Sequence, residues 1–322
     1  MKDKITERLS TLKRQAQFVL SPPFPRELLV EVANICNHSC VFCAYRLMTR
    51  PKGILDLDLY KKIIEDAYRA GSRELGLYAG AEPFSVKALD RYVGHAKKVG
   101  YEYVYITTNG SLATPERLEK VISAGLDSIK FSVNAGDRAT YITVHGQDHF
   151  DKVVANIDYT LRMRDERNSS FKIFISFVES LENADSFSAL SERYSDRVDG
   201  IYHVKAANVS GQNPDLPPLE FDGPCALPFN RISVTREGYL RVCCNDYQNF
   251  LAVEDLSDKS IEEIWQGERM MEIRQRHLEG NLAGTLCHNC MTGDNVVAYP
   301  VNPALCPYEQ ISTIPISVFL DE

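Results

Sequence analysis

Three cysteines within one short segment constrain this chain more than any other feature. The segment Cys36–Cys43 reads CNHSCVFC and follows an apolar run that predicts a strand. Because the spacing is Cys-x3-Cys-x2-Cys, the three sulfurs can converge from one loop. Three thiolates can hold three irons of a [4Fe–4S] cube, which leaves the fourth iron open to another ligand. The segment therefore predicts an iron–sulfur site with one open position.

Zinc and disulfides are the other common uses of closely spaced cysteines. A zinc knuckle takes four ligands in two pairs, and His38 would have to be the fourth from inside the loop, where its geometry is poor. The sequence has nine cysteines and shows no signal peptide. We therefore expect metal binding or catalysis rather than disulfide bonds.

Length and charge limit the remaining possibilities. A chain of 322 residues allows one large domain with a small one, or two domains. The net charge is −8 and no basic stripe is present, which argues against a nucleic-acid partner. No apolar run reaches the length of a membrane span, so we expect no membrane association and a cytoplasmic protein.

Strands and helices alternate through the first two-thirds of the sequence. This alternation predicts a parallel sheet with helices outside it, whose ligands bind at the carboxyl ends of the strands. We expect strands at 27–33, 73–79, 102–107, 127–133, 171–178 and 200–204, and helices at 58–70, 86–99, 115–124, 150–167 and 184–194.

The cysteine segment resembles that of the radical S-adenosylmethionine (radical SAM) enzymes, including Phe42 before the last cysteine. The resemblance implies a partial (β/α)6 barrel, a [4Fe–4S] cluster held by Cys36, Cys40 and Cys43, and SAM bound to the open iron. It also implies reductive cleavage of SAM to a 5′-deoxyadenosyl radical that abstracts a hydrogen atom from substrate. A flavodoxin- or ferredoxin-type protein is the electron donor that this chemistry implies.

Further segments in the expected order are similar to SAM-binding segments of that family. Gly80-Ala81-Glu82-Pro83 follows the second strand and looks like the Gly-Gly-Glu-Pro segment that binds the SAM amino group, with alanine in place of the second glycine. Thr108 and Asn109 follow the third strand, and Ser132 and Asn134 follow the fourth. The resemblance assigns all of these residues, with Phe42, to cofactor binding. Each segment alone also fits an ordinary strand-to-helix turn.

Three histidines of the barrel region, His145, His149 and His203, could donate protons near a radical site. A lone histidine is more often a packing or surface residue.

A second set of cysteines lies in the last third of the chain. Residues 206–224 are rich in Pro, Asn and Gly and predict a linker. Cys225 is followed by a hairpin pattern over 232–243, an amphipathic helix over 261–278, and then Cys287 and Cys290.

These residues resemble the auxiliary-cluster module of radical SAM enzymes, called twitch in its short form and SPASM in its long form. The resemblance implies an auxiliary [4Fe–4S] cluster held by Cys225, Cys243, Cys287 and Cys290. Zinc in the same four thiolates is the alternative. Cys244 could replace Cys243 as ligand, because adjacent strand residues face opposite ways. Cys306 stays unassigned and fits a small buried apolar residue.

We therefore expect four parts: an N-terminal helix and Pro-rich lead-in (1–25), the partial barrel (26–205), a linker (206–224), and a small α+β auxiliary-cluster domain with a tail (225–322). The predicted function is a radical SAM epimerase or dehydrogenase of natural-product biosynthesis, acting on a sugar, aminocyclitol or aminoglycoside carbon. Cys244 is the candidate hydrogen donor for epimerisation.

Three alternatives remain open at this point. A peptide maturase would epimerise or cross-link a ribosomal peptide, and a nucleotide-modifying enzyme would need a basic cleft. A ferredoxin-like electron carrier would use both cysteine sets as redox centres, but would not need the SAM-like loops.

Overall fold

One continuous sheet organises the molecule. The computed structural model describes residues 16–208, 211–213, 215–294 and 296–306. Within them, nine strands form a sheet in the order β6-β5-β4-β3-β2-β1-β7-β8-β9. The first six are mutually parallel and confirm the predicted order: β1 Glu27–Val30, β2 Glu74–Gly76, β3 Tyr103–Thr108, β4 Ser128–Ser132, β5 Lys172–Glu179 and β6 Gly200–Lys205.

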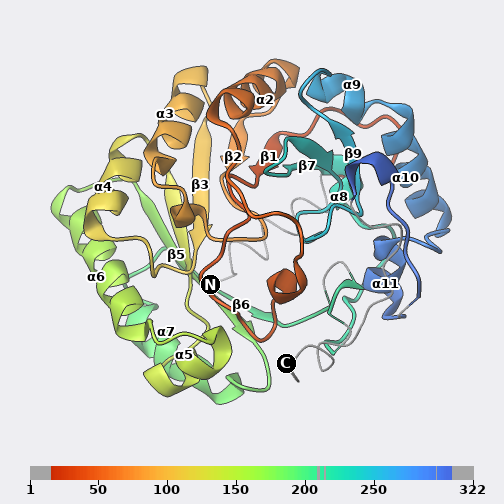
Figure 1. The fold of residues 1–322 in the computed structure, drawn as a ribbon. Coiled ribbons are helices and arrows are strands. Elements are labelled where there is room, and N and C mark those ends of the chain that lie inside the picture. Colours follow the sequence, from red (N-terminus) through yellow and green to blue (C-terminus); the bar gives the residue numbers. More distant parts are fainter. Residues whose placement is uncertain (1–15, 209–210, 214, 295, 307–322) are drawn as a thin grey trace.

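Helices cover the outer face of this curved sheet (Figure 1). They are α2 Leu57–Ala70, α3 Leu89–Val99, α4 Pro115–Ser123, α6 Phe150–Glu166 and α7 Phe187–Tyr194. Side chains of β1 alternate between the two faces of the sheet. Leu28 and Val30 are fully buried in the core under the helices. Their neighbours Glu27 and Glu31 therefore point to the inner face. The sheet thus has an apolar outer layer and a lumen with charged groups.

The C-terminal hairpin extends the barrel sheet. Strand β7 (Arg231–Val234) pairs in parallel with β1, and β8 (Tyr239–Arg241) pairs antiparallel with β7. A further strand, β9 (Ala252–Asp255), was not expected from the sequence. The two cysteine-bearing regions therefore share backbone hydrogen bonds, and the boundaries of the four predicted parts stay a prediction.

One buried arginine fastens the two regions together. The Arg50 guanidinium donates to both oxygens of Glu31 at 2.9 Å and to Glu237 in the β7–β8 turn at 2.7 Å. Its Nε donates to the Tyr247 carbonyl at 2.7 Å. The side chains of Arg50 and Glu31 are each 1% exposed. Because every charge has a partner, this buried cluster can hold β1, the cysteine segment and the hairpin in register.

The expected helix over 261–278 is wrong in one respect, because it is two helices. They are α9 (Ile261–Trp265) and α10 (Glu268–Glu279). Gly267 lies between them as the N-cap of α10 with extended dihedrals (φ −73°, ψ 163°). Its missing side chain matters, because a Cβ there would lie 3.0 Å from the Glu263 carbonyl oxygen.

Helices α5 (Arg138–His145), α8 (Leu227–Asn230) and α11 (Leu286–Thr292) were not predicted. The expected N-terminal helix cannot be followed over 1–15, which lie outside the described residues, and 16–25 contain no helix. No helix in the described ranges is long and apolar enough to cross a membrane.

Candidate active site

The cysteine loop after β1 is anchored on the end of α5. Backbone N–H groups of Ser39 and Val41 donate to the carbonyls of His145 and Val144 at 3.1 and 3.0 Å. These bonds satisfy carbonyls that the end of a helix otherwise leaves without partners. The sequence carried signals for α5, namely the N-cap Asp137 and Gly146 at φ 65°. This missed helix therefore positions the predicted metal loop.

The three thiols of this loop lie close enough to interact electrostatically. Burial, with charge on Glu82 and Cys43 also contributing, raises the pKa of Cys36 to about 12. Burial also raises the pKa of Cys40, with contributions from both other thiols, and that of Cys43. Three buried thiols that resist ionisation can become thiolates only where a cation compensates their charge. This donor set fits the predicted iron cluster.

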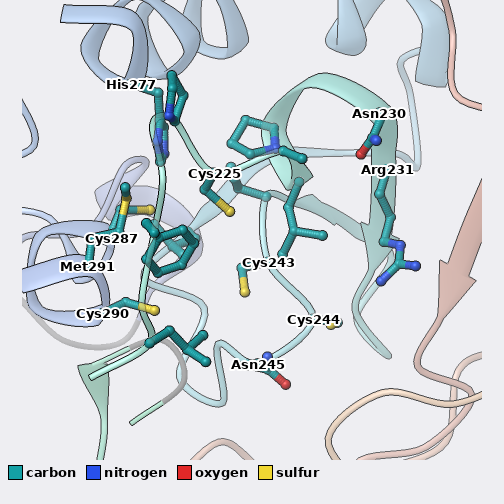
Figure 2. A pocket seen from close by; sticks show the side chains of 18 of the residues that line it. Cys225, Asn230, Arg231, Cys243, Cys244, Asn245, His277, Cys287, Cys290 and Met291 are labelled. Carbon is teal, nitrogen blue, oxygen red and sulfur yellow. The ribbon is translucent and has the colours of Figure 1, made fainter. Parts of the chain in front are cut away.

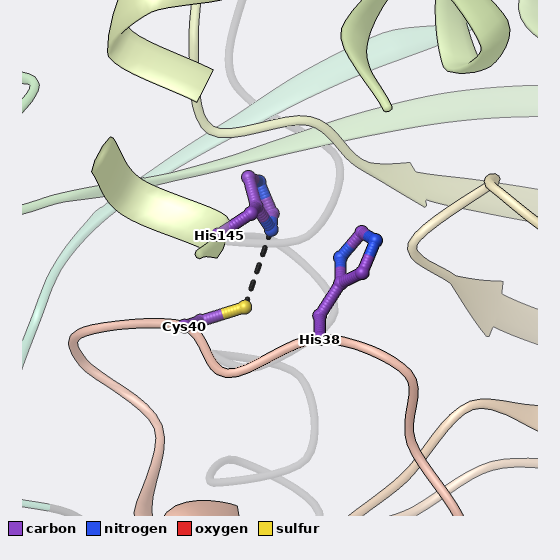
Figure 3. Close-up of side chains that lie close together, drawn as sticks. All are labelled: His38, Cys40 and His145. Atoms are coloured by element: carbon purple, nitrogen blue, oxygen red, sulfur yellow. Dashed lines mark hydrogen bonds between the residues drawn. The ribbon is translucent and has the colours of Figure 1, made fainter. Parts of the chain in front are cut away.

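Two histidines, His38 and His145, lie close to Cys40 of the loop (Figure 3). Cys40 Sγ is 3.2 Å from His145 Nδ1, and His145 Nε2 is 2.8 Å from the Val133 carbonyl oxygen. A carbonyl only accepts, so Nε2 carries the proton and Nδ1 accepts from the Cys40 thiol. Iron binding by Cys40 therefore has to release this contact. Burial lowers the pKa of His145 to about 4.

His38 is buried against the same group and stacks on His149, with 3.1 Å between Nε2 and Nδ1. Its Nδ1 has no hydrogen-bond partner among the described residues. His203 lies elsewhere, on β6, where it pairs with Glu179 at 2.6 Å. The structure thus brings His145 and His149 to the cysteine loop but not His203.

Glu82 ties the loop after β2 to the loop after β3. Its buried carboxylate accepts from Thr108 Oγ1 at 2.6 Å, from the Asn109 N–H at 2.7 Å and from the Phe84 N–H at 2.9 Å. Burial raises its pKa despite these bonds. A carboxylate offers about four acceptor positions. One position therefore stays available for the ammonium group that the sequence comparison assigned to it.

The Asn109 side chain joins the same loops to the cysteines. Its Nδ2 donates to Asn37 Oδ1 at 2.9 Å and lies 4.0 Å from Cys36 Sγ. Asn37 donates in turn to Ser111 Oγ at 2.8 Å. The segments after β1, β2 and β3 therefore meet at one edge of the sheet, as the sequence order predicted.

The other predicted cofactor-binding residues lie near this edge. Asn134 adopts φ 53°, and its Oδ1 accepts from the Val178 N–H at 2.8 Å. Ser132 accepts from Ser176 Oγ at 3.1 Å. Ala81 has no positive φ, so alanine fits the position without strain. Phe42 is half-buried and Gly80 packs against Tyr247. Their SAM-binding roles stay predictions.

The second cysteine set lines a cavity of about 530 Å³ (Figure 2). Cys225 precedes α8, Cys243 and Cys244 follow β8, and Cys287 and Cys290 lie one turn apart on α11. Burial raises the pKa of Cys225 to about 11 and that of Cys287 further, and charge on Cys290 contributes to both. None of the nine cysteines, all of which lie in the described ranges, forms a disulfide bond. The thiol-rich lining fits a second cluster and equally fits zinc.

Cys243 and Cys244 lie next to each other in this cavity, and their thiols share a hydrogen bond. In Figure 2, Cys243 lies between Cys225 and Cys244, and Cys244 lies on the side of Arg231. The hydrogen bond shared with Cys244 and burial raise the pKa of Cys243. The same bond lowers the pKa of Cys244, with help from Arg231 and Arg241. Both thiols line the cavity, and Cys243 as the ligand stays a prediction.

Sequence reasoning missed one side chain of this cavity. His277 on α10 lines it, is 3% exposed, and neither of its ring nitrogens has a hydrogen-bond partner among the described residues. Burial lowers its pKa to about 4. Cys306, by contrast, lies outside the lining and donates to the Gln248 carbonyl at 3.4 Å.

Family comparisons agree with both sites. The family model of the radical SAM superfamily matches residues 30–182, and that of an iron-sulfur cluster-binding domain, SPASM, matches residues 225–291. The chain therefore contains a segment that matches the radical SAM superfamily and a segment that matches the SPASM domain. Its cofactors are SAM, a SAM-binding [4Fe–4S] cluster and an auxiliary [4Fe–4S] cluster.

Two groups of named relatives are similar in sequence. An S-adenosyl-L-methionine-dependent 2-deoxy-scyllo-inosamine dehydrogenase of Niallia circulans is 26% identical over 271 residues, which cover 81% of this chain and 90% of the relative. A probable GTP 3′,8-cyclase of Saccharolobus solfataricus is 31% identical over 131 residues, 41% of this chain and 42% of the relative.

Solved structures confirm the fold. BtrN in complex with AdoMet and 2-DOIA has a TM-score of 0.59 at 19% identity, over 82% of this chain and 92% of that chain. Streptococcus suis SuiB bound to precursor peptide SuiA has a TM-score of 0.64 at 15% identity, over 84% and 70%. At such identities the likeness establishes the fold and leaves the substrate to be found.

Proposed function

We propose that this radical SAM enzyme epimerises one carbon of a small polyhydroxylated substrate, a sugar or aminocyclitol. The position of Cys244 carries the proposal. A cluster of this kind needs four thiolates and the cavity offers five. The fifth, Cys244, lies near Arg231, Arg241 and Glu27, whose charges act on it. Glu27 and Arg231 are register partners on β1 and β7, so Cys244 lies beside the junction of these two strands.

The same thiol also lies near the first cysteine loop. Cys244, together with Cys43 and Cys36, contributes to raising the pKa of Tyr247, so these groups share one region of the lumen. A thiol between the two cysteine sets is placed to meet a substrate radical formed beside the first set.

The cofactors supply, when bound, a 5′-deoxyadenosyl radical that takes a hydrogen atom from a substrate carbon. When Cys243 binds the auxiliary cluster as a thiolate, the proton that the two thiols share remains on Cys244. Cys244 then donates its thiol hydrogen atom to that carbon from the opposite face, which breaks the S–H bond and forms the new C–H bond. The Cys244 thiyl radical takes one electron from the external reductant and one proton from solvent, which restores the thiol. A flavodoxin- or ferredoxin-type donor fits this need in the cell.

The test is a reaction in D2O with SAM and dithionite on a panel of aminocyclitols and sugars. Because a thiol hydrogen exchanges with solvent, we expect an epimer that carries one deuterium at the inverted carbon. The Cys244→Ala variant should still cleave SAM and form no epimer. Epimer formed by this variant at the wild-type rate would exclude the role of Cys244.

Dehydrogenation is the second candidate, because the relative from Niallia circulans is named a dehydrogenase. In that reaction the substrate radical would pass one electron to the auxiliary cluster and one proton to a base, and a ketone would form. The same assay separates the two reactions, since the ketone gains no deuterium from Cys244 and forms equally well in Cys244→Ala.

A further inference from the structure

Tyr247 belongs to the auxiliary region by sequence but lies at the first cysteine loop in space. It follows Cys243 and Cys244 by a few residues, within the match to the SPASM domain. Its hydroxyl oxygen is 3.4 Å from Cys43 Sγ, and the residue is 8% exposed. Tyr247 also forms a small apolar cluster with Ala44 and Tyr45, against which Cys36 and Cys43 pack.

The position of Tyr247 is fixed by several contacts that do not involve its hydroxyl. Arg50 binds its carbonyl at 2.7 Å, and the neighbouring Gln248 accepts from the Thr49 N–H at 3.2 Å. On the other side, a Cβ at Gly80 would lie 2.7 Å from Tyr247 Cε1, so the ring fills the space that glycine leaves. The hydroxyl is therefore held beside Cys43 by packing rather than by its own bond.

The direction of the hydrogen bond follows from the chemistry of Cys43. In the free protein either group can be the donor. Once Cys43 binds iron as a thiolate, it has no proton and can only accept. The Tyr247 O–H then has to be the donor, alongside the Tyr45 backbone N–H that lies 3.5 Å from the same sulfur.

We propose that Tyr247 donates a hydrogen bond to the Cys43 sulfur of the SAM-binding cluster and thereby raises the reduction potential of that cluster. Such a bond stabilises the more negative, reduced state more than the oxidised state, and hydrogen bonds to sulfur are one determinant of cluster potentials. Tyr247 is a positioning residue, through which the auxiliary region sets how easily the first cluster is reduced.

The test compares Tyr247→Phe with Tyr45→Phe in the fully reconstituted enzyme. Tyr45 is the matched control, because its hydroxyl is buried in the same cluster but accepts from the Cys36 N–H at 2.8 Å and faces backbone oxygens. Potentials are measured by titration with detection by electron paramagnetic resonance. The SAM-binding cluster is recognised as the one whose spectrum changes when SAM is added.

For Tyr247→Phe we expect about tenfold less reduced SAM-binding cluster at a fixed potential, a shift of about 59 mV to more negative values for a one-electron couple. The auxiliary cluster should keep its potential. A Tyr247→Phe potential equal to the wild-type value would overturn the proposal, and so would an equal shift in Tyr45→Phe.

A second measurement needs no cluster loading of a variant. In the reduced wild-type enzyme, pulsed resonance should detect a proton coupled to the SAM-binding cluster that disappears after exchange into D2O. Absence of any exchangeable coupled proton would contradict the proposal. Neither measurement uses substrate, so both outcomes are independent of whether the enzyme epimerises or dehydrogenates.

Discussion

The two cysteine sets are built in opposite ways. The first comes from one loop, Cys36–Cys43, whose amides are fastened to the end of α5. The second is assembled from separate segments, before α8, after β8 and on α11, around a common cavity. A loop of fixed spacing specifies its ligands locally, whereas the cavity exists only after the hairpin and helices have packed. The first set is therefore robust to changes elsewhere, and the second depends on the fold.

The largest difference should appear in SAM cleavage. Cys43→Ala removes a ligand of the loop that is predicted to hold the SAM-binding cluster, so we expect 5′-deoxyadenosine formation to fall to background. Cys290→Ala alters only the second set and should leave cleavage measurable while product formation is lost. Quantifying 5′-deoxyadenosine by liquid chromatography checks both variants. Equal loss of cleavage in both would show that the two sets are not separable.

The buried ion pairs of Arg50 test whether the two cysteine-bearing regions depend on each other. Arg50→Met leaves the buried carboxylate of Glu31 without its main partner, and we expect a loss of about 3–5 kcal/mol in the free energy of unfolding. Arg69→Met is the control, because Arg69 is 67% exposed and pairs with Asp66 within the same helix. That exposed pair should contribute less than about 1 kcal/mol. Chemical denaturation of the anaerobic protein compares the free energies of unfolding of the two variants.

If Arg50→Met lowered the free energy of unfolding no more than Arg69→Met does, the two regions would not be held together by this cluster. Iron content of the same variant is a second readout. The second set should lose more iron than the first, because two of its cysteines follow the hairpin directly, whereas the first set meets this region through Tyr247.

Serine variants at Cys243 and Cys244 sharpen the comparison within the second set. Cys243→Ser should lose about four irons, since its thiol faces the cavity with Cys225 and Cys290. Cys244→Ser should keep its iron and lose only epimerisation. The reverse pattern would make Cys244 the ligand and would remove the basis of the proposed hydrogen transfer.

The smallest effect concerns acid stability of the cluster-free protein. Burial lowers the pKa of His38 to about 3 and those of His145 and His277 to about 4. Below the unfolded value near 6.5, the unfolded chain binds protons that the folded protein does not. Stability should therefore fall as the pH decreases from about 6.5 to about 4.

Thermal melts across this pH range measure the effect. His277→Gln should reduce the slope, because it removes one such group from the second site without touching the first. A slope unchanged in this variant would mean that His277 titrates normally in the folded protein.

Local sequence signals predicted the barrel well. The six parallel strands follow from periodicity and from residues that end each strand. The assignment of the cysteine loop and of the segments around Glu82 and Asn109 came from the resemblance to radical SAM enzymes, and their cofactor-binding roles stay a prediction. Helix α5 was missed although Asp137 and Gly146 bound it, because its short sequence shows weak helical periodicity. Its importance appears only in the folded protein, because its last carbonyls accept hydrogen bonds from the cysteine loop.

The second site could be predicted only in part. Spacing identified the cysteines but left Cys243 and Cys244 equivalent, because their directions depend on how β8 ends. Neither His277 nor Tyr247 could be recognised as a site residue from the sequence. Tyr247 is far in sequence from the first cysteine loop, which it contacts. His277 reaches the cavity only through the packing of α10. The break at Gly267 was likewise hidden, as the apolar pattern runs through both helices.

The most direct test of two separate clusters is the iron and sulfide content of anaerobically reconstituted protein, wild type beside the Cys36/Cys40/Cys43→Ala triple variant. Two clusters predict about eight irons in the wild type and about four in the variant. About four irons falling to none would contradict this account, because the second cysteine set would then bind zinc or no metal.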